Sequence, residues 1–116
     1  MRSIINLIIA KEFSEIPGAR YPEEGDYSGQ DFRKNYLIPK IKEAIEKHCI
    51  LLIDLDGTAG YGTSFLEEAF GGLIRNDNFT YEQLNNIIEF KSEEDSEYIN
   101  EINEYLKDAQ DKKNHQ

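Results

Sequence analysis

Residues 49–66 have the sequence CILLIDLDGTAGYGTSFL. Residues 49–55 form an almost unbroken apolar run of strand length, which is typical of a central strand covered on both faces. The glycines that follow are too frequent for regular secondary structure, and from Phe65 onward apolar residues recur at helical spacing. This stretch therefore predicts a buried strand, a turn and a helix that begins near Thr63 or Ser64.

The same patterns predict further elements on both sides of this stretch. Ser28 or Asp31 is available to cap the first long helix. The pair Gly71-Gly72 inside a helical pattern indicates close packing against another backbone or the end of the helix itself, and we favour packing. The remaining expected elements are a strand over 3–10, a long loop over 12–29, a helix over 30–47 that Pro39 kinks or divides, a short helix near 81–85, an edge strand over 87–90 and a helix over 95–110.

Strands and helices that alternate in this order predict an α/β domain with a mixed or parallel sheet of three to four strands, flanked by helices. We expect a single domain over residues 1–111, followed by a polar tail over 112–116. In such sheets ligands and partners meet the carboxyl ends of the strands, where helix N-termini also favour negative charge. Residues 54–64 are therefore the expected functional region.

The formal charge of −10 repels phosphate backbones and anionic lipid surfaces, and no basic patch in the sequence offsets it. We therefore expect neither nucleic acid nor a membrane as partner. Cys49 cannot form an internal disulfide because it is the single cysteine. The apolar run at residues 4–9 is too short for a signal peptide or a membrane span, so we expect a cytoplasmic protein.

Three blocks of the chain, residues 27–33, 53–57 and 60–73, together resemble the STAS-like domain family of unknown function. Members of this family are often encoded beside, or fused to, histidine-kinase-like ATPases in bacteria and their mobile elements. The resemblance covers about residues 26–75. It implies a small regulatory α/β domain whose partner is a histidine-kinase-like ATPase or a related switch protein. The sequence is also compatible with a homodimer.

The resemblance extends to bacterial anti-sigma factor antagonists of the STAS fold. In these, an Asp-Ser-Ser-Gly turn follows an apolar strand, and a serine kinase that doubles as an anti-sigma factor phosphorylates the first serine. On that pattern Gly62 takes the aspartate place, Thr63 the phosphoacceptor place, Ser64 that of the second serine and Phe65 that of the glycine. This chain has neither the acidic residue nor the final glycine of that turn. The resemblance therefore implies the docking surface more fully than it implies phosphorylation.

Thr63 and Ser64 are the candidate phosphoacceptors, because a phosphate there would add about −1.5 to −2 charges at a helix N-terminus and repel an acidic or apolar partner. Two structural alternatives stay open. Ser64 and Glu67 fit a capping box, and Tyr61 fits either an exposed anchor or a ring folded back over the helix. The expected partner-binding residues are Asp56, Gly57, Tyr61, Gly62, Thr63, Ser64, Glu67 and Glu68.

Two other functions remain as alternatives. The first is a small magnesium-dependent phosphatase or phosphotransferase, because residues 54–58, DLDGT, resemble the first motif of haloacid-dehalogenase-type phosphatases, with Asp54 as nucleophile and Asp56 as general acid/base. No later pair of carboxylates completes a magnesium site, so we expect no catalytic residue, metal or cofactor. Arg20 and Arg33 would hold a phosphate only if the long loop folds over the turn. The second is an acidic inhibitor that imitates nucleic acid through the expected C-terminal helix over 95–110, which lies in the acidic stretch over 82–111.

Overall fold

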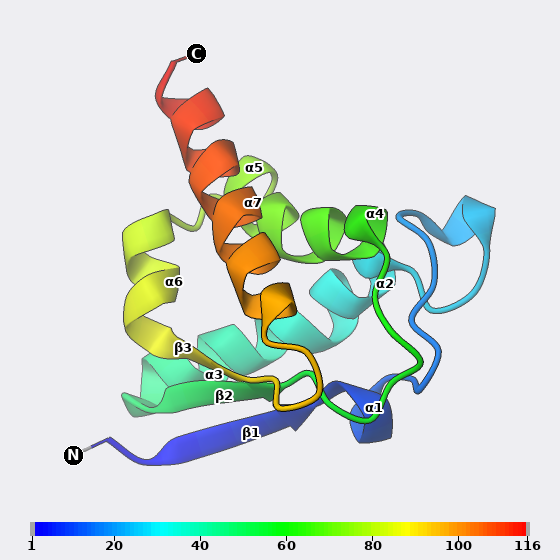
Figure 1. The fold of residues 1–116 in the computed structure, drawn as a ribbon. Helices are drawn as coiled ribbons and strands as arrows, with labels where there is room; N and C mark the ends of the chain where they lie inside the picture. The colour runs from blue at the N-terminus through cyan, green and yellow to red at the C-terminus, as the bar shows by residue number, and fades with distance from the viewer. Residues whose placement is uncertain (1, 116) are drawn as a thin grey trace.

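A computed structural model describes residues 2–115 of the chain, in which strands alternate with helices (Figure 1). Strands β1 (Ile4–Ile8), β2 (Ile50–Asp54) and β3 (Ile88–Lys91) form a three-stranded parallel sheet in the order β1-β2-β3. The expected α/β class, the central position of β2 and the edge position of β3 are confirmed.

Two long helical segments, residues 29–47 and 63–75, each contain a π-helical turn. Pro39 lies in the first turn of α3, directly after the first π turn, so the expected division of this helix is confirmed. Proline has no N–H to donate to the carbonyl four residues earlier. The helical elements are α1 (Ile9–Glu12), η1 (Pro22–Glu24), α2 (Gly29–Phe32), η2 (Arg33–Leu37), α3 (Ile38–Lys47), α4 (Thr63–Leu66), η3 (Glu67–Gly71), α5 (Gly72–Arg75), α6 (Tyr81–Ile87) and α7 (Glu97–Asn114).

Helix boundaries differ from the expected ones at both ends of the chain. The first strand was expected to reach residue 10, but it ends at Ile8. Helix α1 begins directly after it with Ile9, which is completely buried. Helix α7 continues to Asn114 instead of ending near residue 110. Its last turn is docked on the fold, since Lys113 Nζ donates to the carbonyl of Ile74 and to Asn78 Oδ1, both at 2.8 Å. Residues 112–114, which were expected to belong to a polar tail, are therefore part of this helix.

The cap expected at Ser28 is confirmed, because its hydroxyl accepts from the Asp31 N–H at 3.1 Å.

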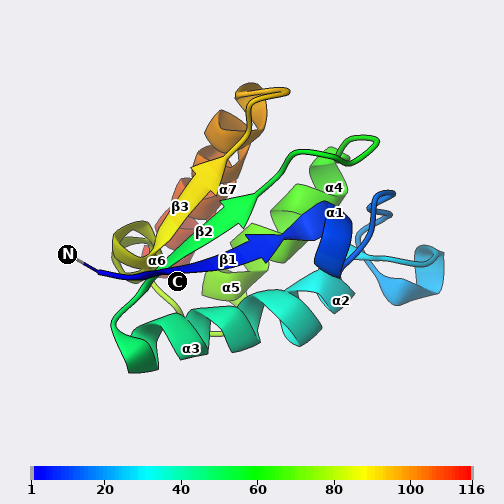
Figure 2. The same ribbon diagram turned by 90° about the horizontal axis from the view of Figure 1, so that it is seen from below.

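Within residues 2–115, helices cover only one face of the sheet, contrary to the expectation for β2. Helices α3, α4, α5 and α7 lie on the same side of it (Figures 1 and 2). The strand order explains this arrangement, because two right-handed crossovers that step in the same direction place their helices on one face. Leu51 points into this core and is completely buried, whereas Leu52 on the opposite face is half-buried and Ile4 is 55% exposed.

Aromatic side chains from both helical segments fill the centre of the core. The rings of Phe32 and Phe65 lie 5.9 Å apart, and those of Phe32 and Phe70 lie 6.4 Å apart. All three side chains are completely buried. This packing fixes segment 63–75 against segment 29–47, so the amino end of α4 is held rigidly at the carboxyl edge of the sheet.

Candidate functional site

The turn that follows β2 is clamped to the loop before α7. Asp56 accepts the backbone N–H of Glu94 at 2.9 Å and that of Glu93 at 3.1 Å, and the Gly57 N–H donates to the Glu94 carboxylate at 2.6 Å. The Glu94 N–H, supported by that of Glu93, holds the pKa of Asp56 below its ordinary value, although burial opposes this shift. The Asp56 carboxylate is thus engaged by the fold, and its place in a partner surface stays a prediction.

Asp54, the other carboxylate of the DLDGT turn, is also paired within the fold. Its Oδ1 accepts the N–H of Asp56 at 2.9 Å, and its Oδ2 lies 3.7 Å from Lys91 Nζ. Across residues 2–115, no group of three or more His, Cys, Asp or Glu side chains is arranged to hold a metal ion. Both carboxylates of the DLDGT turn are thus engaged by groups of the fold.

Tyr61 points inward from the turn. Its hydroxyl donates to the carbonyl of Leu55 at 2.8 Å, and its ring centroid lies 5.8 Å from that of Phe65. Only 8% of the residue is exposed, and this burial raises the pKa of the Tyr61 hydroxyl. Gly60 permits the inward turn because its φ of +130° is accessible mainly to glycine. The exposed anchor is therefore wrong, and the alternative in which the ring folds back over the helix is confirmed.

Gly62, Thr63 and Ser64 are exposed at the start of α4. Gly62 is the N-cap residue and no side chain caps the helix, so the expected capping box of Ser64 and Glu67 is wrong. Within the described residues, the hydroxyls of Thr63 and Ser64 make no hydrogen bond that would hold them inside the fold. The helix thus presents free backbone N–H groups and two hydroxyls to the outside.

Glu68 faces the interior, one helical turn further along. Its side chain is 2% exposed and pairs with Arg33, whose side chain is 3% exposed. Arg33 Nη1 also donates to the Glu68 carbonyl at 2.7 Å. Arg33 Nε lies 3.0 Å from Asp77 Oδ2, close enough for an ion pair, but neither atom makes a hydrogen bond. Because a buried guanidinium needs a carboxylate partner, Glu68 turns inward, and its expected place in a partner surface is wrong.

Glu67 lies between two half-exposed arginines. Arg75 donates to it from Nη1 at 2.7 Å and from Nη2 at 3.3 Å, and Arg20 pairs with it on the other side. Burial favours the neutral acid, but the hydrogen bonds from Arg75 and Arg20 outweigh it and lower the pKa of Glu67. Arg20 and Arg33 therefore hold carboxylates of segment 63–75, and neither folds over the turn as a phosphate ligand.

Residues 28–98 match the sequence pattern of the STAS-like domain of unknown function (DUF4325). The chain belongs to this family. The match spans the turn, the exposed amino end of α4 and the buried Arg33–Glu68 pair, so these features lie within the STAS-like domain. No curated protein and no solved structure shows significant similarity to the chain. Among the helices of residues 2–115, none combines the length and the apolar composition needed to cross a membrane.

The glycine pair of the STAS-like domain makes room for charged side chains. A Cβ on Gly72 would lie 2.2 Å from Arg33 Nη1, and a Cβ on Gly71 would lie 2.6 Å from Glu67 Oε2. The expected close packing is confirmed, but the neighbours are side chains and not another backbone. This difference could not be seen in the sequence, because it depends on where Arg33 and Glu67 point.

We expect Gly72→Ala to destabilise the STAS-like domain by about 1–3 kcal/mol, because the new methyl group must displace a buried, paired guanidinium. Gly62→Ala is the matched control, since a Cβ there would meet nothing within 4 Å. Urea denaturation followed by circular dichroism measures both. Equal midpoints for the two variants would contradict the contact between Gly72 and Arg33.

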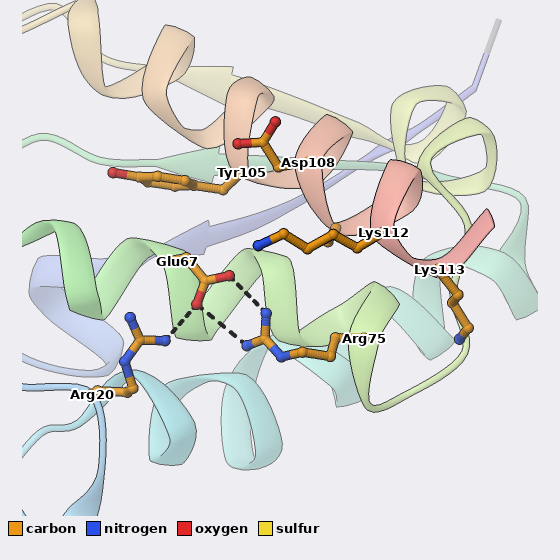
Figure 3. A pocket seen from close by; sticks show the side chains of 8 residues that line it. Arg20, Glu67, Arg75, Tyr105, Asp108, Lys112 and Lys113 are labelled. Atoms are coloured by element: carbon orange, nitrogen blue, oxygen red, sulfur yellow. Dashed lines mark hydrogen bonds and ion pairs between the residues drawn. The ribbon is translucent and has the colours of Figure 1, made fainter. Parts of the chain in front are cut away.

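A pocket of about 480 Å³ lies between α7 and segment 63–75 of the STAS-like domain (Figure 3). Its walls carry Arg20, Glu67 and Arg75 on one side, and Tyr105 and Lys112 on the other. Sequence reasoning did not propose Arg75, Tyr105 or Lys112 as site residues. The seven-residue spacing of Tyr105 and Lys112 is a signal of a shared helix face, but it does not say what that face meets.

Proposed function

We propose that this STAS-like domain is a regulatory protein-binding module without catalytic chemistry of its own. Its docking surface consists of Gly57, Gly62, Thr63 and Ser64. The observation that carries the proposal is the uncapped amino end of α4, where the hydroxyls of Thr63 and Ser64 are exposed and unused by the fold. Because the aromatic core holds this helix end in place, a partner would bind it without ordering a flexible loop.

We further propose that the partner is a histidine-kinase-like ATPase, as the resemblance to anti-sigma factor antagonists suggests. Phosphorylation of Thr63 or Ser64 would act as the switch. The helix dipole stabilises a phosphate at these positions, and both side chains are exposed, so a phosphate on either would face the outside. The added charge of about −1.5 to −2 would repel an acidic or apolar partner surface.

Phosphomimetic variants test this function. We expect Thr63→Glu or Ser64→Glu to weaken binding to a histidine-kinase-like ATPase partner by about tenfold or more, because each places a negative charge in the interface. Isothermal titration calorimetry with the purified ATPase measures the affinity. Asn86→Glu is the matched control, since it adds the same charge at an exposed position of α6, near the opposite edge of the sheet (Figure 1).

Thermal unfolding separates lost binding from lost folding in this experiment. A glutamate in the first turn of a helix is stabilising by about 0.3–1 kcal/mol, so Thr63→Glu should unfold at the same temperature as the parent chain or slightly above it. The docking surface is wrong if all three variants bind equally well. Absence of binding by the parent chain would reject the proposed partner.

A further inference from the structure

The pocket between α7 and segment 63–75 contains a cation that the fold does not use. Arg20 and Arg75 pair with Glu67, and Lys113 is held by Ile74 and Asn78. Lys112 is exposed, and within the described residues it makes no ion pair or hydrogen bond. Figure 3 shows its side chain extending across the pocket toward Glu67 and Arg75.

Charge in this pocket has the opposite sign to that of the molecule. The chain carries a formal charge of −10, yet the pocket walls carry four cations, those of Arg20, Arg75, Lys112 and Lys113, and two carboxylates, those of Glu67 and Asp108. The buried Glu68 carboxylate also contacts Arg20 at 3.4 Å and Arg75 at 3.3 Å. Asp108 also lines the pocket, but its carboxylate points away from Glu67 and Lys112 (Figure 3). Both arginines are therefore paired with glutamates, and Lys112 is the group of this pocket that an added anion would neutralise.

Donor geometry favours an anion with several oxygens. Both hydrogen bonds of Arg20 to glutamates leave from Nη1, so its Nε and Nη2 are not used by these bonds. Lys112 brings three further N–H donors. A phosphate group accepts hydrogen bonds in several directions at once, whereas a carboxylate accepts them mainly in one plane. Tyr105 is half-buried beside these donors, and its ring offers a flat apolar wall.

We infer that this pocket binds a small phosphate monoester. Lys112 holds the phosphate, and the ring of Tyr105 contacts the remainder of the molecule. The volume of about 480 Å³ lies in the range of small-ligand sites. The site includes neither Thr63 nor Ser64, and Tyr105 and Lys112 lie beyond the family match over residues 28–98, so it would be a property of this chain more than of the family.

Nuclear magnetic resonance titration at constant ionic strength tests this site. The probes are inorganic phosphate, ribose 5-phosphate, adenosine 5′-monophosphate and adenosine. We expect saturable shifts of the amide signals of Tyr105 and Lys112 with the phosphate-bearing probes and none with adenosine. Tighter binding of the nucleotide than of the sugar phosphate would show that the Tyr105 ring contacts the base. Equal binding of the two would show that the site contacts only the phosphate and the sugar.

Two variants of α7 make the test specific. Lys112→Gln should weaken binding of the phosphate-bearing probes about tenfold, because it removes the unpaired cation. Lys107→Gln removes the same charge from an exposed position of α7 outside the pocket, and should change affinity less than twofold. Both positions are exposed, so both variants should fold. The inference is overturned if no phosphate-bearing probe saturates at millimolar concentration, or if both variants bind alike.

Discussion

Arg33→Met should lower the free energy of unfolding by about 3–5 kcal/mol, as expected when one partner of a buried ion pair is removed. The side chains of Arg33 and Glu68 are only 3% and 2% exposed. Without Arg33, the Glu68 carboxylate stays buried with only longer contacts, at 3.4 Å to Arg20 and 3.3 Å to Arg75. Guanidinium chloride denaturation measures the loss.

Arg20→Met is the control for this prediction. Arg20 pairs with the same helix but is 29% exposed, so its loss should cost about 1 kcal/mol or less. The double variant Arg33→Met, Glu68→Leu should recover part of the stability, because it removes both buried charges together. If Arg33→Met costs no more than Arg20→Met, the Arg33–Glu68 pair does not hold the two helical segments together.

Leu51→Ala should cost about 2–5 kcal/mol, whereas Leu52→Ala should cost about 1 kcal/mol. The two leucines are neighbours in β2 and undergo the same chemical change, so strand propensity cancels between them. They differ in the face of the sheet to which they point, because Leu51 is completely buried beneath the helices and Leu52 lies on the uncovered side. Urea denaturation of both variants gives the difference.

The comparison should be repeated at several protein concentrations. A cost of Leu52→Ala that approaches that of Leu51→Ala would show that the second face of the sheet is covered in solution. A dependence on concentration would then identify a second copy of the chain as the cover. A large and constant difference agrees with a sheet that is covered on one side.

The fold could be predicted from periodicity, because strands and helices alternate and their apolar residues follow the expected spacing. The uncovered face could not be predicted. Ile50 and Leu52 are apolar, and an unbroken apolar run is typical of a strand buried on both sides. Which face is covered depends on strand order and crossover hand, and a single strand's sequence carries neither.

The candidate site was predictable where it depends on local sequence. The glycines that precede the helical pattern predicted an exposed turn at this position. In the structure, Gly62, Thr63 and Ser64 are exposed. Glu68 was misplaced, and the pairing of Glu67 was missed, because their partners are distant in the chain. Glu68 lies 35 residues from Arg33, and Glu67 lies 47 residues from Arg20. Helical spacing places both glutamates near the outer surface, but these pairings turn Glu68 inward and fix Glu67 between two arginines.

The π-helical turn η3 sets the angular relation between the two ends of segment 63–75. Each residue of an α-helix advances the rotation by about 100°, so a turn that holds an additional residue reorients everything after it by about that angle. Deleting one residue between 67 and 71 would leave Thr63 where it is and swing Arg75 away from α7. Homologues that differ in length by one residue at this point should therefore share the exposed helix end and differ in the pocket.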